Sequence, residues 1–207
     1  MALDFSYTAR RYEAQVEVPH YVEHYNRAQY FLQLCKQCKC YGNRYGCPPF
    51  DSDPLASLSQ YSHVLIVGFK VTPSHRALPL AQAGEFMAPI TAQLNAELLN
   101  LEKQMQGYAL GFVGSCPYCA GAPCARVEGK PCLHPDKVRP SLEAYGFDLQ
   151  KTAQELLGIE IKWSKDDKIP EYLTLIGGVF YTLQLKMISK IQLIGNKEVT
   201  LLVKLNR

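Results

Sequence analysis

The spacing of apolar residues along the chain predicts several β-strands. Residues 6–18 are rich in β-forming side chains and predict an opening strand. Residues 63–71 form a continuous apolar run of strand length, which is typical of a strand buried on both faces of a sheet. Residues 108–113 predict a second, short buried strand. Residues 159–163 and 172–185 also have strand character, so the sequence predicts a sheet of several strands.

Helical periodicity is strongest between the two buried runs. Residues 83–106 carry apolar side chains at helical spacing, and Gly107 is the expected stop. Pro19 predicts the start of an earlier helix that runs to Cys35. Because a strand, a long helix and a second strand follow in this order, the sequence predicts a right-handed parallel βαβ unit. Ligands gather beyond the C-terminal ends of the strands in such units.

Shorter signals complete the predicted fold. Ser141 is the expected cap of a short helix that ends at Gly146, and Asp148 caps another that ends at Gly158. Residues 191–205 hold two apolar runs around a Gly–Asn pair, which predicts a C-terminal β-hairpin. The fold class is therefore α/β, with helices and a small parallel or mixed sheet.

Composition predicts an ordinary soluble globular protein. The 207 residues are 47% hydrophobic and 20% charged, which suits a single domain, 1–207, with a substantial core. No signal peptide and no membrane span is predicted, because the N-terminal segment lacks an apolar core and the longest apolar stretch is too short for a bilayer. We therefore expect a cytoplasmic protein with reduced thiols. The net charge of +3 comes without a dense basic stripe, which argues against nucleic acid as a partner.

The eight cysteines fall into two tight groups. The first contains Cys35, Cys38, Cys40 and Cys47, and the second contains Cys116, Cys119, Cys124 and Cys132. Both lie in segments rich in Gly and Pro, 35–50 (the first cysteine loop) and 114–135 (the second cysteine loop). Cysteines that form disulfides or fill a core are usually spread along a chain, so this grouping predicts two metal-binding loops.

The second cysteine loop has the arrangement C-x2-C-x4-C-x7-C, and its four thiolates can wrap one metal centre. Structural zinc usually takes two short hairpins separated by a longer spacer. Crowded cysteines flanked by Pro and Gly more closely resemble iron–sulfur loops of the ferredoxin type. The pattern favours a [4Fe-4S] cluster, with Zn or unligated thiols as alternatives. His134, two residues after Cys132, could replace one cysteine as a ligand, but with four cysteines present it is better explained as a surface residue or a neighbour of the ligands.

The first cysteine loop is less regular. Cys35, Cys38 and Cys47 form a C-x2-C-x8-C set, and Cys40 stands between them. Cys40 is either the fourth ligand of a complete structural site or a free thiol. With three ligands, one iron would stay open to substrate or water, as catalytic sites require.

Several other polar residues have a structural explanation beside a functional one. Arg126 and Arg139 either stabilise the charge of a cluster or solvate an exposed loop. Arg139, Glu143 and Asp148 could orient the loop through charge-assisted hydrogen bonds or touch a substrate, and the structural role is favoured because helix caps already explain the pattern. The pair formed by His20 and His24 has chelating helical spacing but is more often a solvated helix face. These residues are secondary candidates.

Two strings of residues resemble a known family. YGNRYGCPPF follows the paired cysteines, and CPYC is followed by GKPCLHPDKVRPSLEAYGFDL. These strings are similar to the pattern C-x2-C-x2-YG-x2-W-x-CPP, then C-x-HP-x3-RPS-x-EA-x-G-x-D, of an uncharacterised prokaryotic family of predicted metal-binding proteins. The likeness covers residues 35–50 and 114–149, weakens through residue 181, and leaves the tail 182–207 outside.

The resemblance implies a set of metal ligands. By position they are Cys35, Cys38, Cys47, Cys116, Cys119, Cys124 and Cys132. Cys40 lies outside the family pattern, Tyr45 stands where the family has Trp, and the spacing from Cys119 to Cys124 is longer here than in relatives. The resemblance implies metal binding and names no reaction.

These observations lead to two main hypotheses of function. The first is a cytoplasmic iron–sulfur protein with one or two [4Fe-4S] clusters, which exchanges electrons with a redox partner protein or a small-molecule substrate. The alternative is a zinc-stabilised module that recruits a protein or nucleic acid. A third is a thiol sensor that uses Cys38 and Cys40. No phosphate-binding or nucleophile-elbow motif occurs in the sequence, so nucleotide-driven and serine-hydrolase mechanisms have no support.

Overall fold

The computed structural model describes residues 4–74, 79–111, 116–119, 121–183 and 198–204. Its centre is a five-stranded sheet in the order β3-β4-β2-β1-β5, and all neighbouring strands are antiparallel. The strands are β1 (Asp4–Glu17), β2 (His63–Pro73), β3 (Tyr108–Leu110), β4 (Leu173–Tyr181) and β5 (Glu198–Lys204). The prediction of an α/β fold with an opening strand is confirmed.

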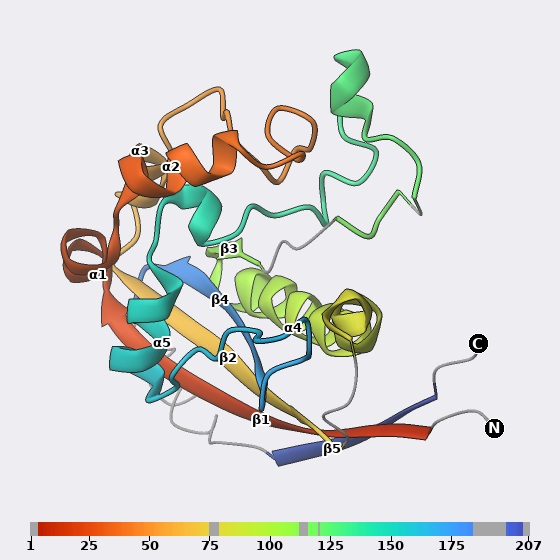
Figure 1. The fold of residues 1–207 in the computed structure, drawn as a ribbon. Helices are drawn as coiled ribbons and strands as arrows, with labels where there is room; N and C mark the ends of the chain where they lie inside the picture. Colours follow the sequence, from red (N-terminus) through yellow and green to blue (C-terminus); the bar gives the residue numbers. More distant parts are fainter. Residues whose placement is uncertain (1–3, 75–78, 112–115, 120, 184–197, 205–207) are drawn as a thin grey trace.

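Helices lie on both faces of this sheet (Figure 1). The α-helices are α1 (Val18–Tyr25), α2 (Ala28–Lys36), α3 (Pro54–Leu58), α4 (Ala83–Met105) and α5 (Leu149–Leu157). The short 3-10 helices of the described residues are η1 (Leu80–Gln82), η2 (Ala125–Glu128) and η3 (Glu143–Tyr145). The long helix α4 packs on one face of the sheet, against β3 and β4, whereas α1 and α5 pack on the other.

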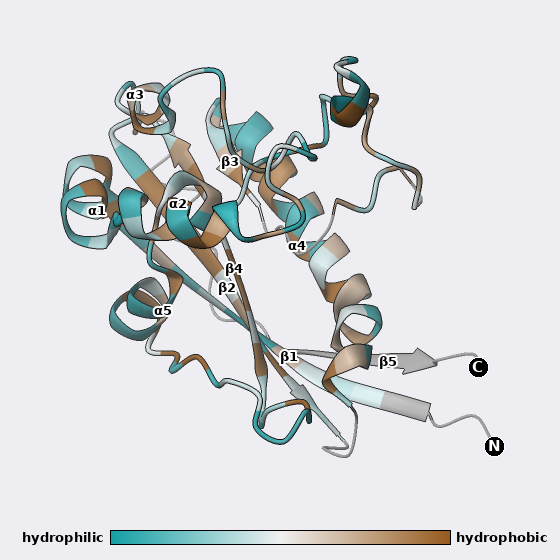
Figure 2. Ribbon diagram, turned by 45° about the horizontal axis from the view of Figure 1, so that its top comes forward, coloured by the Kyte–Doolittle hydropathy of each residue, from teal (hydrophilic) through white to brown (hydrophobic). Residues whose placement is uncertain are grey.

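β2 is buried on both faces, as its apolar run predicts. Leu65, Val67 and Phe69 point into the core beneath α4, while Val64 and Ile66 point into the core beneath α1 and α5. β2 and β4 are mostly hydrophobic, whereas α1 and α5 mix hydrophobic and hydrophilic residues (Figure 2). The sheet therefore separates two cores, and the residues of its middle strands alternate between them.

The predicted parallel or mixed sheet is wrong. β2 and β3, which precede and follow α4 in the sequence, do run in the same direction. In the sheet, however, β4 lies between them and is antiparallel to both. A strand from the C-terminal third of the chain is inserted into the expected βαβ unit. Local sequence does not encode that insertion, because β4 reaches its place through long-range backbone pairing.

The helix predicted from Pro19 to Cys35 is interrupted. It divides into α1 and α2 because the chain between them pairs with a distant turn. The amide N–H of Arg27 donates to the carbonyl of Gly146 at 2.7 Å, and the Asn26 side-chain amide donates to the carbonyl of Tyr145 at 2.9 Å. These contacts fix the direction in which α2 carries Cys35.

Other predicted boundaries are refined by packing. Residues 159–163 do not form a strand, although Ile159 is buried in the core beneath α5. The helix α4 ends with Gln106, rather than Gly107, in the left-handed conformation (φ 51°). Gly107 has another role, since a Cβ there would lie 2.3 Å from the carbonyl oxygen of Phe180.

The C-terminal prediction is tested only in part. β5 pairs antiparallel with β1 at the edge of the sheet. The first arm of the predicted hairpin and its Gly–Asn turn lie outside the described residues. None of the described helices is both long and apolar enough to cross a bilayer.

Candidate metal centre

Both cysteine loops lie at one end of the sheet, beyond α2 and β3 (Figure 1). Cys35 sits in the last turn of α2, and the chain then makes successive turns up to the Pro48–Pro49 pair. The second cysteine loop follows β3, at the strand end where a functional loop was expected. Residues 114, 115 and 120 of that loop lie outside the described residues. All eight cysteines are described, and all are free thiols.

The four thiols of the first cysteine loop lie within electrostatic reach of one another. Burial, followed by the neighbouring Cys40, Cys38 and Cys35, raises the pKa of Cys47 to about 11. Burial and the neighbouring Cys38 also raise the pKa of Cys35. The structure thus places Cys40, which is 7% exposed, beside the three cysteines that the sequence pattern groups together.

The second cysteine loop gathers its thiols in the same way. Burial raises the pKa of Cys116, a backbone N–H bond from Tyr118 opposes this, and Cys119, Cys132 and Cys124 raise it further. Four thiols gathered in one loop are a donor set whose protons a metal ion can displace. The residues present therefore fit a soft thiolate-binding metal or cluster.

Backbone N–H groups point at three of the sulfur atoms. The Cys40 amide donates to Cys38 Sγ at 3.5 Å and the His134 amide donates to Cys132 Sγ at 3.4 Å. The Tyr118 amide donates to Cys116 in the same i+2 pattern. Such bonds stabilise thiolate charge and tune the metal centre they surround.

The sulfur atoms are neighbours but have not converged on a common point. Within the described part of the chain, no group of three or more Cys, His, Asp or Glu has the arrangement of a metal site. Because metal-bound cysteines are thiolates, binding a metal would release the protons of these thiols.

Arg126 joins the two loops. Its guanidinium, from η2 of the second loop, donates to three carbonyls of the first loop: Arg44 at 2.7 Å, Cys47 at 2.6 Å, and Pro49. In return, the Tyr45 hydroxyl donates to the carbonyl of Lys130. The sequence predicted a cationic role for Arg126 but not this one, since a bond to a distant backbone carbonyl leaves no pattern in the sequence.

Arg139 and Asp148 have structural roles. The Arg139 guanidinium donates to both carboxylate oxygens of Glu102 on α4, at 2.8 and 2.5 Å. Glu102 also accepts the Ala109 amide at 2.7 Å, so this pair ties the exit of the second loop to α4 and β3. Asp148 accepts the Lys151 amide at 3.0 Å and caps α5, as predicted.

The Glu102–Arg139 pair predicts a pH-dependent stability. Burial alone would raise the pKa of Glu102, but the bonds from Arg139 and Ala109 outweigh it and lower the pKa. A carboxylate with a lowered folded-state pKa adds stability above its unfolded pKa of about 4.3 and loses it as the pH falls further. We expect Glu102→Gln to cost about 1.5–3 kcal/mol near pH 7 and much less at pH 3.

Urea unfolding of both proteins at pH 7 and pH 3 measures this difference. Glu23→Gln is the matched control, because the Glu23 side chain is largely exposed on α1. A constant gap between Glu102→Gln and the parent protein at the two pH values would contradict the proposed charge interaction.

The histidine candidates do not join the thiols. The rings of His20 and His24 stack with centroids 4.1 Å apart, and His24 Nδ1 bonds to the carbonyl of His20. The ring of His134 lies beside that of Tyr118, with centroids 6.0 Å apart. It is the backbone of His134, through its N–H, that contacts Cys132.

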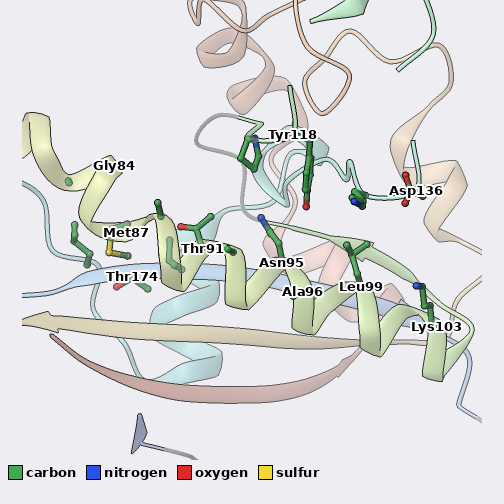
Figure 3. A pocket seen from close by; sticks show the side chains of 17 residues that line it. Gly84, Met87, Thr91, Asn95, Ala96, Leu99, Lys103, Tyr118, Asp136 and Thr174 are labelled. Atoms are coloured by element: carbon green, nitrogen blue, oxygen red, sulfur yellow. The ribbon is translucent and has the colours of Figure 1, made fainter. Parts of the chain in front are cut away.

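A cavity of about 780 Å³ lies between α4 and the second cysteine loop. Its floor is a row of α4 side chains that includes Met87, Thr91, Asn95 and Leu99, and Tyr118 extends toward this row from the loop (Figure 3). A smaller recess shares Asn95 and Tyr118 with the cavity and is lined by Cys116. Sequence reasoning missed this cavity, because its walls come from segments far apart in the chain.

Comparison with protein families adds a match over residues 22–181, to the family described as predicted metal-binding protein (DUF2284). The chain belongs to this family. The match includes both cysteine loops and Arg126, and it confirms the family resemblance of the two sequence strings. Comparison with curated proteins and with solved structures gives no match.

Proposed function

We propose that this member of the predicted metal-binding family is a cytoplasmic iron–sulfur protein that carries one or two [4Fe-4S] clusters in its cysteine loops. The observation that carries the proposal is the gathering of four thiols in each loop, each set within electrostatic reach. Soft thiolates at this density are the ligands of iron–sulfur clusters. The N–H groups aimed at Cys38, Cys116 and Cys132 suit sulfur atoms that carry charge.

The second loop would hold a complete centre through Cys116, Cys119, Cys124 and Cys132. In the first loop, Cys35, Cys38 and Cys47 would be ligands, and the nearness of Cys40 to Cys47 supports Cys40 as a fourth. If Cys40 instead remains a thiol, one iron of the first centre is open to a substrate. When bound, a four-iron cluster supplies one-electron redox chemistry.

The protein's own groups would set the conditions for that chemistry. Arg126 brings a positive charge to the junction of the two loops, and the N–H···S bonds add fixed dipoles. Both effects favour the more negative, reduced state of a cluster and raise its potential. The cavity beside Cys116 has the size and apolar lining of a small-molecule site. That supports a small-molecule substrate beside a protein redox partner.

Metal analysis of anaerobically purified protein tests the proposal. We expect a brown protein that absorbs near 400 nm and holds about four iron and four sulfide ions per site. Cys116→Ala and Cys35→Ala should each lose half the iron if there are two centres. Loss of all iron in either variant would indicate one shared centre, and a colourless protein with stoichiometric zinc would overturn the iron–sulfur proposal.

A zinc-stabilised module is the second candidate. Its support is the complete four-cysteine set of each loop and the backbone bonds between the loops, which suit a closed structural site. It predicts that a chelator unfolds the protein and that no redox activity exists. Chelator titration followed by circular dichroism separates it from the iron–sulfur proposal. Thiol oxidation with no metal at all would favour the sensor built on Cys38 and Cys40.

A further inference from the structure

A second cavity, of about 310 Å³, lies between the two cysteine loops. Four aromatic side chains line it: Tyr45 and Phe50 from the first loop region, Tyr108 from β3, and Tyr145 from η3. Asp51 and Cys132 complete its polar lining together with a serine, and two prolines and a valine fill the remaining wall. This volume is at the lower end of the range of about 300–1,000 Å³ for small-molecule sites.

The aromatic rings stand at angles to one another. The rings of Phe50 and Tyr145 are 5.3 Å apart between centroids with planes at 64°, and the ring of Tyr108 is tilted by 34° from that of Tyr145. The hydroxyls of Tyr108 and Tyr145 are 3.2 Å apart and hold the two rings in place. The four rings therefore border the same open cavity from different elements of the fold.

The only charged side chain among the described lining residues of this cavity is a carboxylate. The side chain of Asp51 is exposed at its rim, Cys132 faces it, and none of its described lining residues is Lys or Arg. Nearby cations have other partners, since Arg126 is bound to three carbonyls and Lys130 pairs with Glu128 at 2.6 Å. The Arg126 guanidinium lies 5.8 Å from the centroid of the Tyr45 ring, so a cation–π contact already occupies one side of that ring.

These features restrict the ligand. A phosphate or carboxylate would find no cation in the lining, and a purely apolar molecule would leave Asp51 without a role. Aromatic faces with a carboxylate at the rim are the arrangement that attracts a diffuse organic cation, because π-faces are negative and a quaternary ammonium is weakly hydrated. We propose that the cavity between the cysteine loops binds a quaternary methylammonium group.

The proposal goes beyond the proposed function, because the aromatic walls do not depend on a bound metal. A centre at Cys132 would add negative charge at one wall and strengthen the attraction for a cation. The two proposals can therefore fail separately, provided that metal content and cation binding are measured on the same samples.

Calorimetric titration with choline and with its neutral carbon isostere, 3,3-dimethylbutan-1-ol, tests the proposal. We expect choline to bind at least tenfold more tightly than the alcohol, since only the charge differs between the two. A peptide that carries trimethyl-lysine is titrated in parallel. Tighter binding of choline would indicate a small molecule as the source of the group, and tighter binding of the peptide would indicate a modified protein. Equal binding of choline and the alcohol, or no binding of either cation probe, would overturn the proposal.

Matched variants locate the site. Phe50→Leu removes one aromatic wall and keeps an apolar side chain, and we expect a five- to tenfold loss of choline affinity. Phe31→Leu on α2 is the control, because Phe31 does not line the cavity. Asp51→Asn should weaken choline binding, whereas Asp166→Asn, at an exposed position that does not line the cavity, should not. Unchanged iron and an unchanged unfolding midpoint show that a loss of binding is local, and choline affinity that Phe50→Leu leaves intact would contradict this placement.

Discussion

Replacing Arg126 with alanine is expected to weaken metal binding at the first cysteine loop by about 10- to 100-fold while the second loop keeps its metal. The guanidinium donates to the carbonyls of Arg44, Cys47 and Pro49, so its removal frees three backbone groups around a proposed ligand. Hydrogen bonds to charged groups contribute about 1.5–3 kcal/mol each when buried. Because Arg126 is only partly buried, water can replace much of this bonding, and the expected loss corresponds to about 1.4–2.8 kcal/mol in all.

The measurement is a metal-binding titration of each loop, with the other loop silenced by a Cys→Ala change. Arg126→Lys keeps the charge but not the forked geometry, and we expect it to restore little of the lost affinity. Lys130→Ala is the control for charge alone, since the Lys130 ammonium is exposed. Equal weakening at both loops, or full rescue by lysine, would show that Arg126 acts through its charge instead of through the three carbonyls.

The second large effect is expected from Gly146→Ala, which should destabilise the protein by about 3–5 kcal/mol, the sum of a strained backbone and a steric clash. Gly146 has φ of 87°, and a Cβ there would lie 2.5 Å from the Cα of Ala28. The contacted atom is backbone at the start of α2, so no side-chain rotation relieves the clash. Because α2 carries Cys35, the same substitution should loosen the first cysteine loop.

Gly158→Ala separates the two causes. Gly158 also has a positive φ, 66°, but a Cβ there would have no neighbour within 4 Å. Only the conformational cost remains, and we expect about 1 kcal/mol. Urea unfolding of both variants gives the comparison. Similar losses for Gly146→Ala and Gly158→Ala would mean that the close approach to α2 carries no energy.

Local signals in the sequence predicted the elements better than their arrangement. The burial of β2 on both faces follows from its own apolar run, and the caps at Asp148 and Gly158 follow from local backbone chemistry. The insertion of β4 between β2 and β3 does not follow from any of these segments alone. The same limit explains the break between α1 and α2, which depends on bonds to the distant Gly146.

For the candidate metal centre, too, the sequence predicted the local features and not the long-range contacts. Spacing alone selected the eight cysteines and their two groups, because ligands of one centre lie close in sequence. The joining of the groups by Arg126 and Tyr45 depends on contacts between residues about eighty positions apart. Both cavities have walls from several elements, so neither leaves a periodic pattern in the sequence.

The long antiparallel pairing of β1 with β2 bears on any shortened form of this protein. The family match begins at residue 22, after β1 has ended, and stops at residue 181, before β5 begins. Yet β1 pairs with β2 from Tyr7 to Glu17 and buries Tyr7 and Ala9 beneath α4. A fragment cut to the matched residues would expose an apolar strand edge and is expected to aggregate. We therefore expect a stable fragment to need β1 in addition to the matched residues.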